Sequence, residues 1–187
     1  YRAKQVIKWI HQKGVIDFYK MTNLNKKLIE KLNTIAFIKP PTIEDQFISD
    51  EGTKKYLIKL HSGSMIEMVV IPEGKRRTLC VSSQAGCALQ CTFCATGAQG
   101  FDQNLESDEI IGQLWLANFS EKSKKPITNV VFMGMGEPLL NFDAVIEATK
   151  IIKDQNAYGL SRKRITISTS GIVPNIKKLN KHVDVSL

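Results

Sequence analysis

From residue 78 onward, strand-like and helix-like runs alternate along the chain, and this alternation constrains the fold more than any other feature of the sequence. Strands are expected over 78–82, 127–133, 164–168 and 183–187, and helices over 107–119, 142–153 and 172–180. Two strands separated by a helix pair in parallel through a right-handed crossover. The pattern therefore predicts an α/β fold with the first part of a (βα) barrel, because four strands are too few to close one.

Residues 1–40 are expected to form a small, basic helical module. Apolar side chains at helical spacing favour one helix that ends near Gly14 and a second over 24–37, whose lysines face outward. Pro40 and Pro41 end the second helix, because proline cannot continue one.

Residues 41–77 are expected to be a linker that leads into a β hairpin. Its two strands are predicted at 56–60 and 65–71, and Ser62-Gly63-Ser64 supplies the turn between them. The predicted domains are a helical module, a linker with its hairpin, and a barrel portion, over 1–40, 41–77 and 78–187.

The chain carries an excess of positive charge. Its 187 residues include 26 Lys and Arg against 18 Asp and Glu, a formal net charge of +8, which favours a polyanionic partner such as nucleic acid. Basic clusters at 26–27, 75–77 and 162–164 either contact phosphates or are solvated turns. The sequence lacks both a membrane-length apolar run and a signal-peptide pattern, so a cytoplasmic protein without a membrane partner is expected.

All four cysteines fall in one short stretch, and three of them form the pattern Cys87-x3-Cys91-x2-Cys94. Three thiolates on a tight loop can hold three irons of a 4Fe–4S cluster, which leaves the fourth iron open to the amino and carboxylate groups of S-adenosyl-L-methionine. Phe93 is suited to pack beside the adenosine. The alternative is structural zinc with Cys80 as the fourth ligand, although zinc sites favour two separated C-x2-C pairs.

Polar residues follow two predicted parallel strands, at the edge where α/β sheets bind ligands. Gly136 lets the backbone approach a ligand, and the carboxylate of Glu137 can accept the ammonium of a methionine group; the pair could also be a plain strand-to-helix turn. The Ser168 hydroxyl could reach a ribose or a carboxylate. Its neighbours Thr169 and Ser170 could instead cap the following helix.

Glu67 lies in a predicted strand that is apolar on both faces. A carboxylate in such a run is costly unless it is paired, and burial would raise its pKa. The residues alone favour an ion pair with Lys59 or with a nearby arginine.

Three blocks of the sequence match one family pattern. They are Cys80-Val-Ser-Ser-Gln-Ala-Gly-Cys87 with the cysteine loop, Gly134-Met-Gly136-Glu137-Pro138-Leu-Leu-Asn141, and Ile167-Ser168-Thr169-Ser170-Gly171. Together they resemble the RlmN/Cfr family of radical SAM RNA adenine methyltransferases, and Gln99-Gly100-Phe101 is more similar to its RlmN branch. The resemblance implies a partial radical SAM barrel, a 4Fe–4S cluster on the three loop cysteines, and S-adenosyl-L-methionine at Gly136, Glu137 and Ser168.

The resemblance also implies roles for two further residues. It assigns Glu67 as the general base for a substrate proton, and Cys80 as the thiol that resolves an enzyme–RNA thioether by forming a disulfide. The implied reaction methylates C2 of an adenine in 23S rRNA, at the peptidyl-transferase centre, and in tRNA next to the anticodon. It proceeds through a 5′-deoxyadenosyl radical and a methyl-cysteine, with flavodoxin or ferredoxin as reductant.

Two other functions stay open. One is a Cfr-like methyltransferase acting on adenine C8 of rRNA, and the other is a zinc-stabilised RNA-binding module without catalysis. The family carries its methyl group on a cysteine near the C-terminus, yet no cysteine follows Cys94, and the chain begins with Tyr1. We therefore expect an N-terminal portion that transfers no methyl group alone.

Overall fold

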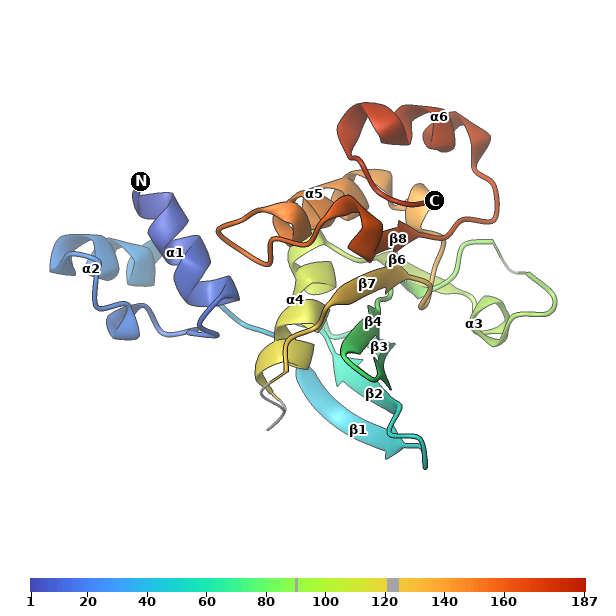
Figure 1. The fold of residues 1–187 in the computed structure, drawn as a ribbon, viewed down its shortest axis with the longest axis horizontal. Coiled ribbons are helices and arrows are strands. Elements are labelled where there is room, and N and C mark those ends of the chain that lie inside the picture. The colour runs from blue at the N-terminus through green and yellow to red at the C-terminus, as the bar shows by residue number, and fades with distance from the viewer. Residues whose placement is uncertain (90, 121–124) are drawn as a thin grey trace.

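One six-stranded sheet organises the chain, in the order β1-β2-β3-β4-β7-β8 (Figure 1). The structure is a computed structural model that describes residues 1–89, 91–120 and 125–187. Neighbours from β1 to β4 pair antiparallel, whereas β4, β7 and β8 pair in parallel, which confirms the α/β fold predicted from the alternating pattern. The strands of this sheet are β1 (Thr42–Ile48), β2 (Lys54–Lys59), β3 (Met65–Glu73), β4 (Arg76–Cys80), β7 (Asn129–Phe132) and β8 (Ile165–Ile167).

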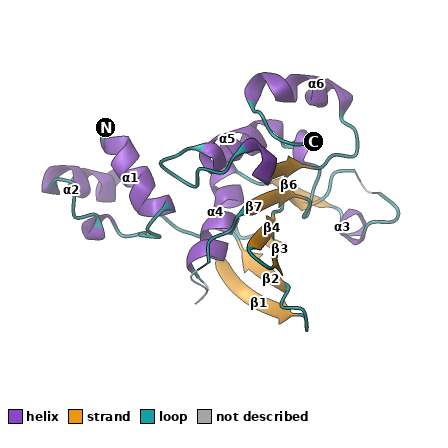
Figure 2. Ribbon diagram, viewed as in Figure 1, coloured by secondary structure: helices purple, strands orange, loops and turns teal. Residues whose placement is uncertain are grey.

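In the part of the chain that the structure describes, the long helices of the barrel portion lie along one side of the sheet (Figure 2). The main core lies between the strands and helices α4 (Ser107–Phe119) and α5 (Phe142–Lys153), and α6 (Val173–His182) follows β8. Alternate residues of β2 and β3, including Tyr56 and Met68, are buried in this core. The residues between them stay exposed or half-buried, and we call the side on which they lie the open face.

The N-terminal helical module has a small core of its own and docks on the barrel portion. It comprises α1 (Arg2–His11), the 3₁₀ turn η1 (Phe18–Lys20) and α2 (Lys26–Ile35), which pack around Phe18, Met21, Leu24 and Ile29. The Trp115 indole donates to the Ile10 carbonyl at 3.0 Å, and His11 Nδ1 is hydrogen-bonded to the Tyr158 hydroxyl at 3.0 Å. Burial lowers the pKa of His11 to about 4, so the contact is made by a neutral imidazole.

Strand β1 replaces most of the linker that the sequence predicted. All seven of its residues are exposed, so the strand has no buried stripe that a sequence pattern could reveal. Its position is fixed by backbone pairing with β2 instead, with a bulge between Ile43 and Asp45. The predicted hairpin strands are present as β2 and β3, and they continue the barrel sheet without a break.

Several boundaries differ from the predicted ones. Strands β5 (Gln84–Gly86) and β6 (Phe101–Asn104) form a second small sheet around the cysteine loop, which contains the short helix α3 (Ala95–Ala98). Helix α4 is capped by Glu106, in a reciprocal capping box with Glu109. The strand expected over 183–187 is reduced to one parallel bridge between Thr166 and Ser186.

Helices α1 and α2 are each shorter than predicted, whereas α5 has the predicted bounds. Short 3₁₀ turns η2 (Pro138–Leu140) and η3 (Arg162–Arg164) precede α5 and β8. Within the described residues, no helix combines the length and the apolar character needed to cross a bilayer.

Gly86→Ala is expected to lower the free energy of unfolding more than Gly63→Ala does. Both glycines are in the left-handed region, at φ 72° and 98°, so alanine costs about 1–3 kcal/mol at either site. At Gly86 the new Cβ would also lie 2.0 Å from the Gly100 carbonyl oxygen, whereas at Gly63 it would meet no described residue within 4 Å. Urea unfolding should show an additional loss of about 1–3 kcal/mol for Gly86→Ala. Equal losses would contradict this account of the loop base.

Candidate active site

Glu67 and Cys80 lie on the open face of the sheet, on adjacent strands. Val69 of β3 is directly opposite Cys80 of β4, so these two side chains share a face. Glu67 precedes Val69 by two positions and therefore lies on that face too. The two residues to which the resemblance assigns proton transfer and thiol chemistry are thus brought together by strand pairing.

Glu67 forms an ion pair, but its partner is not the one favoured from the sequence. The Lys55 ammonium lies 3.0 Å from Oε1 of Glu67, and the side chains are 49% and 46% exposed. Lys55 and Lys59 both lie on the open face of β2, each diagonal to Glu67, and the ion pair is formed with Lys55. The backbone carbonyl of Glu67 accepts a hydrogen bond from the Ser82 hydroxyl at 2.6 Å, which ties β3 to the chain after β4.

Cys80 ends β4 and is half-buried, between Val69 of β3 and Val131 of β7. Burial raises the pKa of the Cys80 thiol, and a hydrogen bond with the Met133 backbone opposes the shift in part. The thiol is therefore protonated at neutral pH and needs to lose its proton before it can act as a nucleophile.

The cysteine loop projects from the small sheet, and its base is tightly closed. Cys87 is buried, and its backbone N–H donates to the Gly100 carbonyl at 2.9 Å. At the other end, the N–H of Cys94 donates to the Cys91 carbonyl at 3.0 Å. Backbone N–H groups at the start of α3, first that of Gly97, lower the pKa of the Cys94 thiol, which favours a thiolate.

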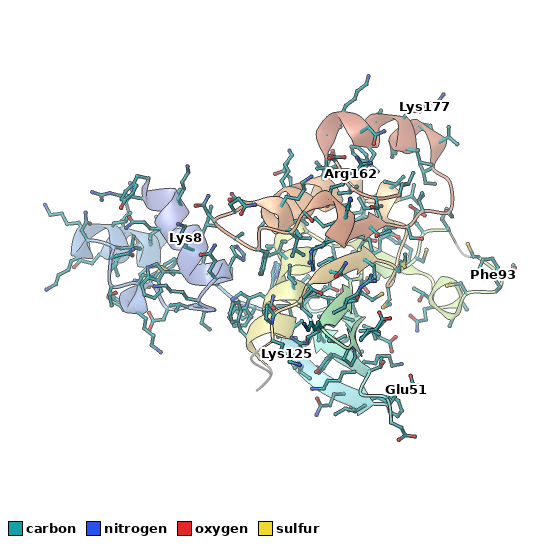
Figure 3. The ribbon with its side chains drawn as sticks, viewed as in Figure 1. Lys8, Glu51, Phe93, Lys125, Arg162 and Lys177 are labelled. Atoms are coloured by element: carbon teal, nitrogen blue, oxygen red, sulfur yellow. The ribbon has the colours of Figure 1, made fainter. Side chains whose placement is uncertain are left out.

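The loop thiols are not gathered at metal-ligating distances. Across residues 1–89, 91–120 and 125–187, no three Cys, His, Asp or Glu side chains form a group that could hold a metal ion. All four cysteines are free thiols. Phe93, predicted to pack beside an adenosine, is 92% exposed at the tip of the loop and points away from the sheet (Figure 3).

Gly136 and Glu137 follow β7, and both are held by β5. Gly136 has φ 93°, and a Cβ there would lie 2.5 Å from the Gln84 side chain, so only glycine fits. The Glu137 backbone N–H donates to the Gln84 amide oxygen at 3.0 Å. Residue spacing does not single out Gln84, because its role comes from contacts between segments that are distant in the sequence.

The Glu137 carboxylate is buried and joins two loops. Its Oε1 accepts from the Leu139 backbone N–H at 2.9 Å, and its Oε2 accepts from the Ser170 N–H at 2.8 Å and the Ser170 hydroxyl at 2.9 Å. One prediction had Ser170 capping the next helix, and this is wrong. Helix α6 begins after Ile172 without a side-chain cap. Ser168 directly follows β8, at the start of the same loop, and is exposed.

Two protein-family models match the chain. The radical SAM superfamily model covers residues 81–187, and the ribosomal RNA large subunit methyltransferase N-terminal domain model covers residues 1–38. The chain is 58% identical to the dual-specificity RNA methyltransferase RlmN of Pseudomonas putida and 56% identical to that of Pseudomonas fluorescens. Both alignments cover 100% of this chain and 50% of the relative, so the chain spans about half the length of the curated relatives it matches.

A solved structure has the same fold. A radical SAM methyltransferase from Sphaerobacter thermophilus superposes with a TM-score of 0.89 at 36% sequence identity, over 100% of this chain and 55% of that one. The superfamily model covers β7, β8, the cysteine loop and the Gly136-Glu137 turn, and its residues 81–187 make up more than half of the chain. On these grounds the chain belongs to the radical SAM superfamily.

Proposed function

We propose that the protein containing this chain is a radical SAM RNA methyltransferase that methylates C2 of an adenine in 23S rRNA and in tRNA. The observation that carries the proposal is the placement of Glu67 and Cys80 on one open face, beside the strand ends that lead to Gly136 and Ser168. The curated relatives, which are named as dual-specificity RNA methyltransferases, support a substrate class of two RNAs. The excess of positive charge is also suited to RNA.

Membership of the superfamily brings two cofactors, a 4Fe–4S cluster and S-adenosyl-L-methionine. The donor set fits a cluster, because three thiols share one loop and backbone N–H groups favour the thiolate of Cys94. Cys87, Cys91 and Cys94 would hold the cluster, and Gly136 and Ser168 would hold S-adenosyl-L-methionine, with Glu137 fixing the loops that carry them. When bound, these groups supply a 5′-deoxyadenosyl radical and, with an external flavodoxin or ferredoxin, the electron that generates it.

Glu137 would stabilise this site by holding its two loops together. Its carboxylate is already occupied by three hydrogen-bond donors, so its main contribution is to fix the loops after β7 and β8. The backbone of Gly136 and the exposed hydroxyl of Ser168 remain on the ligand side.

Glu67 and Cys80 would act on the RNA. The half-exposed carboxylate of Glu67 can accept a proton from the substrate once Lys55 yields to it. The Cys80 thiol would then resolve a covalent enzyme–RNA thioether by forming a disulfide with the second cysteine of the complete protein. Mass spectrometry of 23S rRNA and tRNA from a strain lacking the complete gene tests the function, since loss of 2-methyladenosine from both RNAs is expected.

Cys87, Cys91 and Cys94 should each be required for iron, whereas Cys80 should not. The three lie on one loop, and Cys80 lies in β4 of the main sheet. After anaerobic reconstitution with iron and sulfide, Cys91→Ala should lose nearly all cluster absorbance and Cys80→Ala should keep it. If Cys80→Ala lost iron as completely as Cys91→Ala, a four-cysteine site of the zinc type would be the better description.

Glu67→Gln in the complete protein should lower turnover by about 10²–10⁴, the usual contribution of a positioned general base. The amide retains the shape of the side chain but cannot take up a proton, so iron content and S-adenosyl-L-methionine binding should be unchanged. Glu73→Gln, an exposed glutamate on the same strand, is the matched control and should keep normal turnover. Normal turnover in Glu67→Gln would leave the residue a structural role only.

Cys80→Ala in the complete protein should trap RNA on the enzyme. Without the thiol, the covalent adduct forms but is not resolved, so denaturing gels should show a protein–RNA band that survives boiling. Cluster absorbance should be unaffected, which separates this defect from loss of the cofactor. Multiple turnovers without such a band would remove Cys80 from the reaction.

A further inference from the structure

A groove on the open face extends from Glu67 toward the edge of the sheet. Its volume is about 420 Å³. Its lining comes from β1, β2 and β3 and consists of Asp45, Gln46, Phe47, Lys55, Leu57 and Glu67. Nothing in the family resemblance assigns a role to β1, which the sequence had predicted to be a linker.

The most unusual group in this groove is an exposed aromatic ring. Phe47 is 65% exposed, and it is the aromatic residue among those that line the groove. It is directly opposite Lys55, which is opposite Val69, which is opposite Cys80. Directly opposed residues share a face, so the ring lies in one row with the Cys80 thiol.

The row is too long for one base to span. Strands are spaced by about 4.8 Å, so Phe47 is roughly 14 Å from Cys80 across the sheet and roughly 10 Å from the strand of Glu67. A target adenine that meets Glu67 and Cys80 therefore cannot also stack on Phe47. Adjacent bases that stack in a nucleic-acid strand are only about 3.4 Å apart. A second base of the RNA can therefore reach Phe47 only if it is unstacked from the target adenine.

We propose that Phe47 and Lys55 form a binding subsite for a nucleotide that flanks the target adenine in single-stranded RNA. Phe47 stacks on the base of that nucleotide, because every base offers a π-face and aromatic rings are the usual platforms for unpaired bases. The inference rests on the proposed function, since it takes the target position to be over Glu67.

The lysines of this face favour RNA as the occupant, because each can pair with a phosphate, although Asp45 and Glu67 also line the groove. Lys55 and Lys59 lie on the same face of β2, two positions on either side of Leu57. The Lys55 ammonium, 3.0 Å from Glu67, can pair with a phosphate of the flanking nucleotide instead, and this exchange frees the carboxylate for the target. Binding of the flanking nucleotide thus releases Glu67 from its ion pair with Lys55.

The test uses the complete protein and a synthetic RNA hairpin with one adenine in its loop. A 5-iodouridine placed immediately 5′ or 3′ of that adenine reports stacking, because irradiation links it to an aromatic ring in contact. Peptide mass spectrometry should locate the link at Phe47 for one of the two positions. Phe47→Ala should weaken hairpin binding by about 5- to 150-fold, and Phe47→Trp should restore it.

Ile48→Ala is the matched control, since Ile48 is the next residue of β1, is 51% exposed and points to the other face. It should bind the hairpin like the wild type. Lys55→Gln should make the slope of log affinity against log salt shallower by about 0.7.

The outcomes separate the subsite from the function. Methylation of the hairpin by the wild type tests the proposed function, and an unmethylated adenine overturns that function. Normal methylation with no link at Phe47, or with equal losses in Phe47→Ala and Ile48→Ala, overturns the subsite alone. Hydrogen exchange that shows β1 covered by another segment of the complete chain, with or without RNA, overturns it as well.

Discussion

The buried carboxylate of Glu137 fixes the ligand end of the sheet. A buried charge is costly unless donors surround it, and Glu137 meets this requirement with the Leu139 N–H and both donors of Ser170. Because those donors come from the loops after β7 and β8, neither loop can shift without leaving the charge unpaired. The Gly136 turn packs against Gln84 of β5, so the position of β5 and of the base of the cysteine loop is fixed relative to these two loops.

The antiparallel strands fix Glu67 and Cys80 relative to each other, as Glu137 fixes the loops after β7 and β8. A hairpin that stood apart from the barrel would leave Glu67 free to move relative to the thiol of Cys80. Instead, β3 pairs with β4 in a fixed register, and the Ser82 hydroxyl bonds to the Glu67 carbonyl. The placement of Glu67 relative to Cys80 is therefore set by backbone pairing between β3 and β4.

Elements with a buried stripe were predictable from the sequence, and contacts between distant segments were not. Helix α5 has its predicted bounds because one of its faces is apolar throughout, whereas the fully exposed β1 carries no pattern at all. The loop cysteines and Glu67 were identified from spacing and resemblance. The contacts of Lys55 with Glu67 and of Ser170 with Glu137 became apparent only from the structure, because they depend on strand register and on the packing of one loop against another.

Cys80 and Cys94 differ in protonation state and therefore in their rate of oxidation. A thiolate reacts with peroxide and oxygen-derived oxidants far faster than a thiol does. Burial keeps Cys80 protonated, so it resists conversion to sulfenic acid while the protein is idle. Cys94 has the lowered pKa and is only partly covered, so oxidative damage in air should begin on the loop and spare the strand. A protein inactivated by air would therefore lose its capacity to hold iron while its sheet and its Cys80 thiol stayed intact.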